Sequence, residues 1–295
     1  SQYGDLPISS FVELNKQHFN SLSFDNNGQI SCNGISGCDV IAKQTQLLLG
    51  TWLEWQQNNG PLSAYTLVTQ LNEKNQNVAL KQSDTETFNS EQDHQTQEFG
   101  LVYQGPRIKT ELIASNGIRT PTLFELFGDR GLFKGSKELL PEQAKTLSLG
   151  ATYNNQIAHL SYSLNASAYH QQSDNAIVAI FNSSGVGAYR NVSDATLNGL
   201  ELETKITVSP ALSLNVQANI IDSQTSSVIK SFNHKKLPGI YHQQYSLSVN
   251  YQLNPQWKIH LRSAVDKDLY FNRPNIFTST NGQAGKPAQR RITDI

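Results

Sequence analysis

The sequence predicts an all-β chain, folded as an antiparallel up-and-down sheet of about twelve strands of the kind that forms transmembrane barrels. Three observations lead to this fold class. Apolar and polar residues alternate over long stretches, as they do in a strand with one apolar and one polar face. Very short and very long connections alternate between these stretches. Aromatic residues gather beside the short connections.

The alternation defines the strands. Every second residue from Leu200 to Val208 is apolar or threonine, for instance, and polar residues stand between them. We expect one meander whose apolar residues, such as Leu200, Leu202, Leu247 and Val249, face outward into lipid. Most segments reach the roughly 9–11 residues that a tilted membrane strand needs. The expected strands cover residues 8–21, 43–57, 62–74, 95–104, 107–118, 144–154, 157–172, 195–209, 212–222, 241–254 and 257–268, with one more starting near 289.

The connections alternate in length along the whole chain. In a compact soluble domain, so many long loops would count against the strand assignment. Outer-membrane barrels, in contrast, have short periplasmic turns and longer extracellular loops. The short connections lie at residues 58–61, 105–106, 154–156, 209–211 and 254–256, and the long ones at 22–43, 74–95, 118–144, 172–195, 222–241 and 268–289.

Aromatic residues mark one end of the expected sheet. Trp55, Tyr103, Tyr153, Tyr251 and Trp257 lie within a few residues of a short turn, on the apolar face of their strands. This arrangement is typical of the aromatic girdle at one membrane interface. A soluble β-sandwich or β-barrel with one buried face is the alternative, and it explains neither the girdle nor the unequal loops.

The composition excludes several other classes. The chain of 295 residues has a net charge of -1 and only 16% charged residues, whereas soluble domains average about 25%. The balance of charges gives no electrostatic footprint for nucleic acid. No apolar run reaches the roughly 18 residues of a membrane helix. Because the sequence has neither a signal peptide nor any Met, we expect a mature segment or an internal fragment.

Two cysteines, Cys32 and Cys38, lie in the first long loop. Gly34 and Gly37 stand between them, which allows a tight disulfide, and outer-membrane proteins assemble through an oxidising periplasm. We therefore expect a disulfide bond, with two unpaired thiols as the alternative. A metal site needs more ligands than two thiols, and the nearest histidine, His18, lies on the neighbouring strand.

The sequence contains no pattern that predicts catalysis. None of the seven histidines forms a ligand pair at a spacing of two or four residues. Glu201 and Glu203 alternate with apolar residues, which predicts solvated carboxylates facing the lumen. An outer-membrane hydrolase would need a Ser/His pair at the edge of the lumen, and neither His159 nor His260 has a nucleophile at matched height. We expect no enzyme activity, no cofactor and no metal centre.

One long loop is basic, with Lys230, His234, Lys235 and Lys236. Two interpretations stay open. The charges form a solvated surface, which is the more common role of such a run, or they contact lipopolysaccharide phosphates or an anionic ligand.

Two motifs in the loop at 118–144 point to a family. Residues 117–129 read GIRTPTLFELFGD, and residues 135–142 read GSKELLPE before the strand that begins near 144. Together they resemble the aromatic-Arg-Ala-Pro-Thr-Leu-x-Glu-Leu and Gly-Asn-x-x-Leu-x-Pro-Glu motifs of the TonB-dependent outer-membrane receptors. Asn191, followed by NGLELE at 198–203, and LPG at 237–239 continue the resemblance, which covers roughly 95–295. The matching motif residues are Arg119, Pro121, Glu125, Leu139, Pro141, Glu142, Gly199 and Glu201.

The sequence departs from the family pattern at Ile118, Thr120, Ser136 and Leu140. These differences leave the expected fold intact but weaken any statement about the ligand. Haem receptors of the family carry a histidine between the two motifs. Residues 118–142 contain none, which disfavours haem as the ligand.

The resemblance implies a transporter in the bacterial outer membrane. Such receptors form a barrel of about 22 strands with a plugged lumen. An amino-terminal plug contacts the TonB energy-transducing complex, and a scarce extracellular ligand such as an iron–siderophore complex is imported. Residues 1–295 would be one part of the barrel domain, without the plug and the last strand, in contact with outer-membrane lipid and lipopolysaccharide. The alternative is a complete passive porin or adhesin barrel of about twelve strands.

The motif loop contains the expected site residues. Arg119 and Pro121 lie where a strand leaves the membrane, and the forked guanidinium of Arg119 suits a carboxylate or carbonyl on a neighbouring loop. We expect these two residues to anchor the loop, with direct ligand contact as the alternative. The residues expected to face a ligand lie further along the loop and are Phe124, Phe127, Asp129, Arg130 and Phe133.

Overall fold

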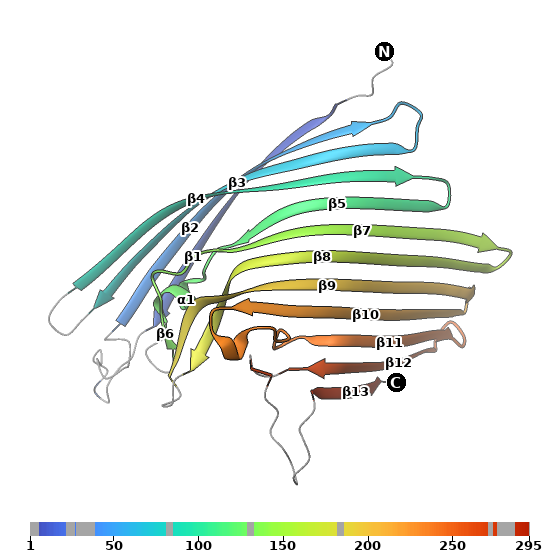
Figure 1. Cartoon of the computed structure of the whole chain (residues 1–295). Coiled ribbons are helices and arrows are strands. Elements are labelled where there is room, and N and C mark those ends of the chain that lie inside the picture. Colours follow the sequence, from blue (N-terminus) through green and yellow to red (C-terminus); the bar gives the residue numbers. More distant parts are fainter. Residues whose placement is uncertain are drawn as a thin grey trace, which may run out of the picture.

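The computed structural model describes residues 6–21, 27, 39–80, 85–128, 133–181, 186–270, 274–275 and 287–294. They form one antiparallel sheet in which strands that are consecutive in sequence are neighbours (Figure 1). The two-residue strand β6 (Phe133–Lys134) lies off this path and pairs with β9. The strands on the path are β1 (Ile8–Ser21), β2 (Asp39–Gln56), β3 (Leu62–Leu80), β4 (Thr85–Gln104), β5 (Ile108–Arg119), β7 (Glu142–Ile157), β8 (Leu160–Phe181), β9 (Gly187–Ser209), β10 (Leu212–Ser227), β11 (Tyr241–Gln252), β12 (Lys258–Leu269) and β13 (Ala288–Asp294).

The predicted meander of twelve strands is therefore confirmed in the described residues. The main error concerns strand length. β3 and β4 continue through most of the expected loop at 74–95, and β8 and β9 through most of the expected loop at 172–195. These extensions lie beyond the alternating part of each strand: in β8, a polar stretch at 171–175 is followed by the unbroken apolar run Ala176–Phe181. Neither a polar stretch nor an unbroken apolar run alternates, so the period of two could not reveal these parts of the strands.

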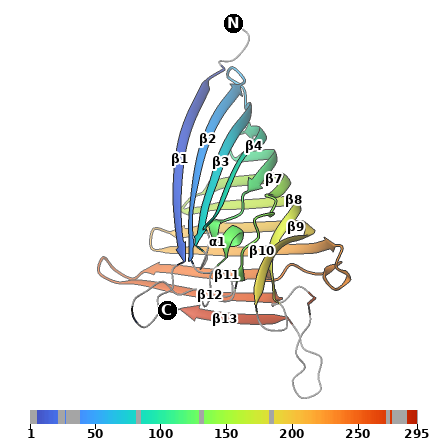
Figure 2. The same ribbon diagram turned by 90° about the vertical axis from the view of Figure 1, so that its left-hand side faces the viewer.

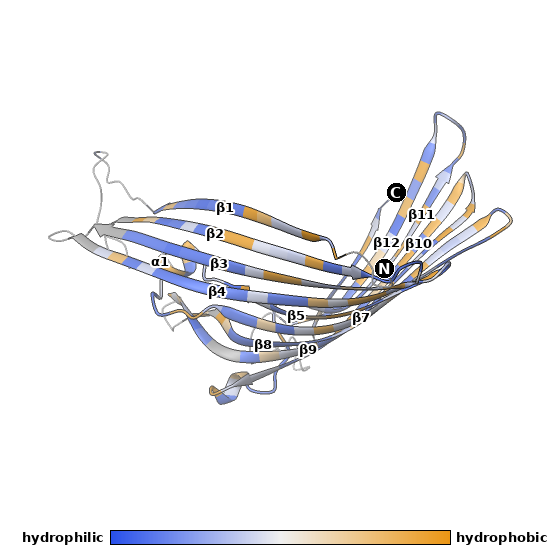
Figure 3. Ribbon diagram, turned by 90° about the horizontal axis from the view of Figure 1, so that it is seen from above, coloured by the Kyte–Doolittle hydropathy of each residue, from blue (hydrophilic) through white to orange (hydrophobic). Residues whose placement is uncertain are grey.

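The outer face of the sheet is apolar where the sequence predicted it to be. Leu200, Leu202 and Leu247 are 40%, 37% and 45% exposed. Val249 is half-buried on the same face, because it pairs with Leu214 of β10. Polar residues occupy the opposite face of the same rungs, and colouring by hydropathy shows the mixture along each strand (Figure 3). Exposed leucines in such numbers would be unfavourable in water. The pattern instead fits a lipid-facing surface.

The sheet is strongly curved and does not close on itself (Figure 2). β1 pairs only with β2, and β13 only with β12, so the two strands at the ends of the described sheet do not pair with each other. A closed ring of twelve strands was the main alternative, and it is not formed. The structure is that of a partial barrel, as the sequence predicted.

Short turns join the strands at one end, where the aromatic residues gather. Trp55 pairs with Ala64, Tyr103 with Leu62, and Tyr153 with Leu164, which places all three rings on the outer face. Tyr251 and Trp257 are 40% and 67% exposed. The predicted placement of these aromatic residues, on the outer face beside the short turns, is thus confirmed. No helix within the described ranges is long and apolar enough to cross a membrane.

Candidate functional site

The motif segment is residues 119–142, between β5 and β7, and its described parts, 119–128 and 133–142, fold back inside the curve of the sheet (Figure 2). The short helix α1 (Leu123–Phe127) begins at Thr122, whose side chain accepts a hydrogen bond from the Glu125 amide while Glu125 accepts from the Thr122 amide. This reciprocal capping satisfies amides that a helix start leaves unpaired. Gly128 ends the helix with a φ of 71°, which glycine adopts without strain.

Arg119 ties this helix to the two strands that flank it. Its Nε donates to Glu142 Oε2 at 2.6 Å, and its Nη1 donates to Glu125 Oε2 at 3.0 Å. Arg119 ends β5, Glu142 begins β7, and Glu125 lies in α1, so one guanidinium joins three elements. The forked donation that the sequence predicted is present. Arg119, Glu125 and Glu142 thus form an ionic clamp that holds the motif segment in place.

The clamp also affects ionisation at Glu142. Burial on its own raises the pKa of this carboxyl, but hydrogen bonds from Arg119 and from the Ile177 amide outweigh burial and hold the pKa below its usual value. The Ile177 amide donates to Glu142 Oε1 at 2.6 Å. Hydrogen bonding to Glu142 in turn raises the pKa of Arg119. Both residues lie beyond the apolar belt, on the side of the long connections.

Acid should therefore weaken the clamp. A carboxyl with a lowered folded-state pKa contributes stability above its unfolded value of 4.5 and loses it as the pH falls through the folded value. We expect the free energy of unfolding to drop below pH 4.5, and we expect Glu142→Gln to remove part of that dependence. Urea unfolding of both proteins between pH 3 and pH 7 measures it. Parallel pH profiles for the two proteins would show that Glu142 contributes nothing to this dependence.

Asn191 on β9 fixes the second motif. Its Nδ2 donates to the Leu140 and Asn175 carbonyl oxygens at 2.9 and 2.6 Å, and its Oδ1 accepts from the Leu140 amide at 2.8 Å. Leu139 is 5% exposed and belongs to the same apolar cluster as Leu123 and Leu126. The motif residues Leu139 and Glu142 thus hold the loop against β8 and β9.

Of the residues expected to contact a ligand, those that the structure describes lie in this segment and differ in how deeply they are buried. Phe127 is 6% exposed and packs in the cluster, with Phe88 as an aromatic neighbour at 5.8 Å between ring centroids. Phe124 and Phe133 are half-buried, and each contacts Tyr189, at 6.0 and 5.5 Å. Asp129 and Arg130 lie outside the described residues, as do Cys32 and Cys38, so the ligand contacts and the disulfide stay predictions.

The side chain of a neighbouring strand explains why position 199 is a glycine. A Cβ at this position would lie 2.1 Å from the Tyr169 ring, which covers the glycine from the neighbouring strand. Aromatic rings over strand glycines are a known stabilising device in sheets. Glu201, two residues further on, faces the inside of the curve beside Ser167 and Asn219.

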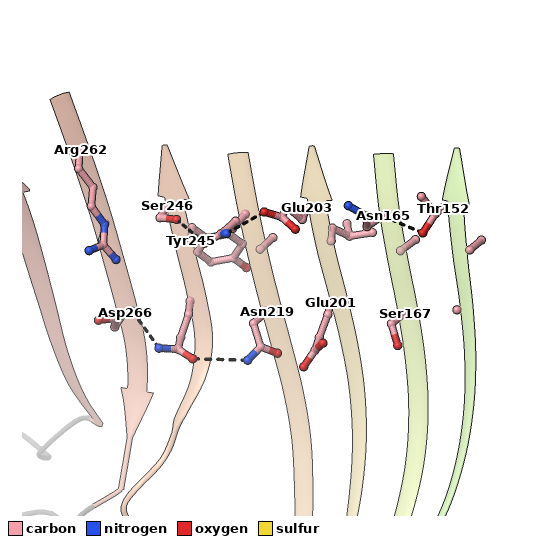
Figure 4. A pocket seen from close by; sticks show the side chains of 18 of the residues that line it. Thr152, Asn165, Ser167, Glu201, Glu203, Asn219, Tyr245, Ser246, Arg262 and Asp266 are labelled. Carbon is pink, nitrogen blue, oxygen red and sulfur yellow. Dashed lines mark hydrogen bonds between the residues drawn. The ribbon is translucent and has the colours of Figure 1, made fainter. Parts of the chain in front are cut away.

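The inner face carries a polar hollow of about 610 Å³ (Figure 4). Hydrogen bonds join its side chains across strands: Thr152 to Asn165 at 2.8 Å, and Gln244 to Asp266 at 3.3 Å. Asp266, 5% exposed, also accepts from Arg290 of β13. The sequence did not reveal these pairs, because they depend on register between strands. Other lining residues labelled in Figure 4 are Ser167, Glu201, Glu203, Asn219, Tyr245, Ser246 and Arg262.

A Ser/His pair is present that the sequence did not reveal. Ser223 Oγ lies 2.6 Å from His242 Nε2, and His242 Nδ1 lies 2.9 Å from the Asp268 carbonyl oxygen. A carbonyl only accepts, so Nδ1 carries the proton and Ser223 donates to Nε2. Ser223 is 1% exposed and also accepts from the Leu237 amide at 2.9 Å. The serine is thus covered and fully hydrogen-bonded, which favours a structural role over a nucleophilic one.

This interpretation predicts that Ser223 does not react. A fluorophosphonate probe, which labels activated serines, should leave the folded protein unlabelled as judged by intact mass. Ser223→Ala serves as the matched control. Labelling that disappears in Ser223→Ala would instead establish a nucleophile and revive the hydrolase interpretation.

No group of three or more potential metal ligands among His, Cys, Asp and Glu occurs in the described part of the chain. What the structure shows is a motif segment anchored inside a curved sheet with an apolar outer face and a polar inner face. That combination defines the class of protein as the wall of a transmembrane β-barrel.

The comparisons with known proteins identify the family. A family model described as TonB dependent receptor-like, beta-barrel matches residues 43–289. The chain therefore belongs to the TonB-dependent receptor-like β-barrel family. No curated protein sequence matches it.

Solved structures agree on the fold. The ferric yersiniabactin uptake receptor FyuA from Yersinia pestis is 15% identical, with a TM-score of 0.67 over 99% of this chain and 43% of its own. The siderophore receptor PiuA from Acinetobacter baumannii is 15% identical, with a TM-score of 0.71 over 97% of this chain and 46% of its own. The copper transporter OprC is 14% identical, with a TM-score of 0.72 over 99% and 45%. The chain thus spans less than half the length of these proteins.

Proposed function

We propose that the chain is part of an outer-membrane receptor that imports a scarce extracellular ligand with energy from the TonB complex, and that an iron–siderophore complex is the ligand class. The observation that carries this proposal is the family match over residues 43–289. It is supported by a sheet that is apolar outside and polar inside. Two of the similar solved structures are named as receptors for siderophores or their iron complexes.

The orientation follows from the two kinds of connection. Short turns face the periplasm in outer-membrane barrels. The motif segment lies at the opposite end of the sheet and therefore faces the outside. There the half-buried rings of Phe124 and Phe133, with Asp129 and Arg130 on the same segment, are the residues proposed to contact the ligand. Phe127, deeper in the apolar cluster, supports them from below.

The proposal includes parts that lie beyond these residues. The two end strands of the described sheet, β1 and β13, each have one edge without a strand partner. In a membrane such edges need neighbours, because unpaired backbone groups in hydrocarbon cost several kcal/mol each. We propose that further strands complete a larger barrel, and that an amino-terminal plug fills its lumen and contacts TonB.

Dependence on TonB tests the proposed function. Cells that express the protein should accumulate radiolabelled iron supplied as siderophore complexes, and deletion of TonB or addition of a proton uncoupler should abolish the accumulation. A strain without the protein is the control. Uptake that continues without TonB and without proton-motive force would contradict the proposal and favour a passive porin.

A further inference from the structure

Two hollows lie on the outer face of the sheet, at the border where the apolar belt ends and the polar extensions begin. The first, of about 450 Å³, is lined by Phe99, Ala114 and Leu147 on one side and by Lys145 and His170 on the other. Four of them form one rung of the outer face, since Phe99 pairs with Ala114, Ala114 with Leu147, and Leu147 with His170, and Lys145 lies two residues before Leu147 on the same face. The hollow therefore has an apolar half and a basic half.

The apolar half points toward the membrane. Phe99 and Leu147 are 55% and 53% exposed and continue the lipid-facing belt of the neighbouring strands. Lys145 lies one rung further from the short turns, opposite Asn116 and Gln172. Within the described residues no carboxylate pairs with Lys145, so its ammonium group is available to an anion from outside.

His170 connects the first hollow to the second. Its Nδ1 lies 2.8 Å from Asn198 Oδ1, and because that oxygen only accepts, Nδ1 is the donor and Nε2 is left for another partner. Asn198 lines the second hollow, of about 220 Å³, together with Asp222 and Lys236. Since His170 pairs with Asn198 and Asn198 with Asp222, the second hollow lies at the same height on the same face.

The basic segment, residues 230–236, is docked beside this second hollow. The Thr225 amide donates to the Lys235 carbonyl and the His234 amide to the Thr225 carbonyl, both at 2.8 Å, which adds the segment to the edge of β10. Asn275 accepts from the Lys236 amide at 2.7 Å and donates to its carbonyl at 3.0 Å. Lys236 Nζ also donates to the Asp222 carboxylate. The lysine is therefore held at the border and does not move freely in solvent.

We propose that these two hollows form one lipid site, called here the border site (Lys145, His170, Asn198 and Lys236), that binds a phosphorylated glycolipid of the outer leaflet. Acyl chains lie against Phe99 and Leu147, and a phosphate accepts hydrogen bonds from the Lys145 ammonium and, when the His170 ring carries a second proton, from His170 Nε2. Phosphates form strong charge-assisted hydrogen bonds with cationic donors. Lys236 stays paired with the Asp222 carboxylate and forms a wall of the second hollow, where the Asn198 Nδ2 group is the neutral donor for sugar hydroxyls. The site rests on the proposed location in the outer membrane.

Binding of lipid A in detergent micelles, followed by native mass spectrometry of the protein purified from outer membranes, tests this site. The probes are bis-phosphorylated lipid A, dephosphorylated lipid A and phosphatidylglycerol. We expect bis-phosphorylated lipid A to bind best. The double variant Lys145→Gln with His170→Gln should weaken that binding by at least about tenfold, because the loss of one charge-assisted hydrogen bond already accounts for that factor. Heat-modifiable migration on a gel verifies that each variant is folded.

Lys74→Gln is the matched control, because Lys74 lies on the outer face of β3 but pairs with Glu91 at 2.9 Å and lines neither hollow. It should bind lipid A like the wild type. If the double variant does not fold, Lys145→Gln alone replaces it, with the same expected direction. Equal binding by wild type and variant, or equal binding of all three lipids, would overturn the border site. Since this assay needs no transport, loss of TonB dependence with intact lipid A binding would contradict the proposed function alone.

Discussion

Replacing Arg119 by alanine is expected to lower the free energy of unfolding by about 2–4 kcal/mol, because it removes charge-assisted hydrogen bonds to two carboxylates that remain in place. Glu125 and Glu142 are only 12% and 26% exposed at the side chain, so neither regains full hydration. The expected loss of stability is not larger because Arg119 is itself 43% exposed, so solvent partly screens its charge. Urea unfolding of the folded barrel measures the change.

Two variants separate the clamp from a general effect of charge. Arg190→Ala removes an exposed arginine from β9, near the same end of the sheet, and should change stability by less than about 0.5 kcal/mol. Arg119→Lys keeps the charge but loses the fork, so it should recover only part of the loss. If Arg119→Ala is no less stable than Arg190→Ala, the clamp does not hold the motif segment.

The second large effect distinguishes the outer face of the sheet from the inner face at two neighbouring rungs. Leu202→Arg is expected to prevent stable assembly, because an arginine on the lipid face costs about 2–4 kcal/mol near the bilayer midplane. Leu202 pairs with Ala166 and Ala218 on the outer face, and none of these side chains can pair with the added charge. The fraction of heat-modifiable protein in outer-membrane preparations measures assembly.

Gln217→Arg is the control for this prediction. Gln217 lies on the inner face, where its Nε2 donates to Glu203 Oε1 at 3.2 Å, so an arginine there meets a carboxylate and water. It should assemble like the wild type. Equal assembly of Leu202→Arg and Gln217→Arg would show that lipid does not cover the outer face.

Much of this architecture could be predicted from the sequence, because the membrane imposes a strict rule. Each strand in the belt needs one face for lipid and one for the polar interior, so the alternation fixes both the strand and its orientation. β1 begins and ends where expected, at Ile8 and Ser21. Outside the belt the rule no longer applies, and the extended parts of β8 and β9 could not be distinguished from loops.

The candidate site was predictable only in part. The fork of Arg119 suggested a carboxylate partner, but which carboxylates it reaches depends on how the segment folds. Helix α1 has five residues, too few to show a helical period. Ser223 of β10 and His242 at the start of β11 meet because the two strands are neighbours in the sheet, and neither residue stands in a recognisable motif.

In a barrel wall, lipid covers one face of the sheet and the polar interior borders the other. A nitroxide scan along β9, from Gly199 to Val208, tests it most directly when the accessibility of each label to oxygen, which concentrates in lipid, is measured in reconstituted membranes. We expect maxima at even-numbered positions, including 200, 202 and 206, and minima at odd-numbered ones such as 201 and 203. Maxima at the odd positions, or no alternation, would contradict it.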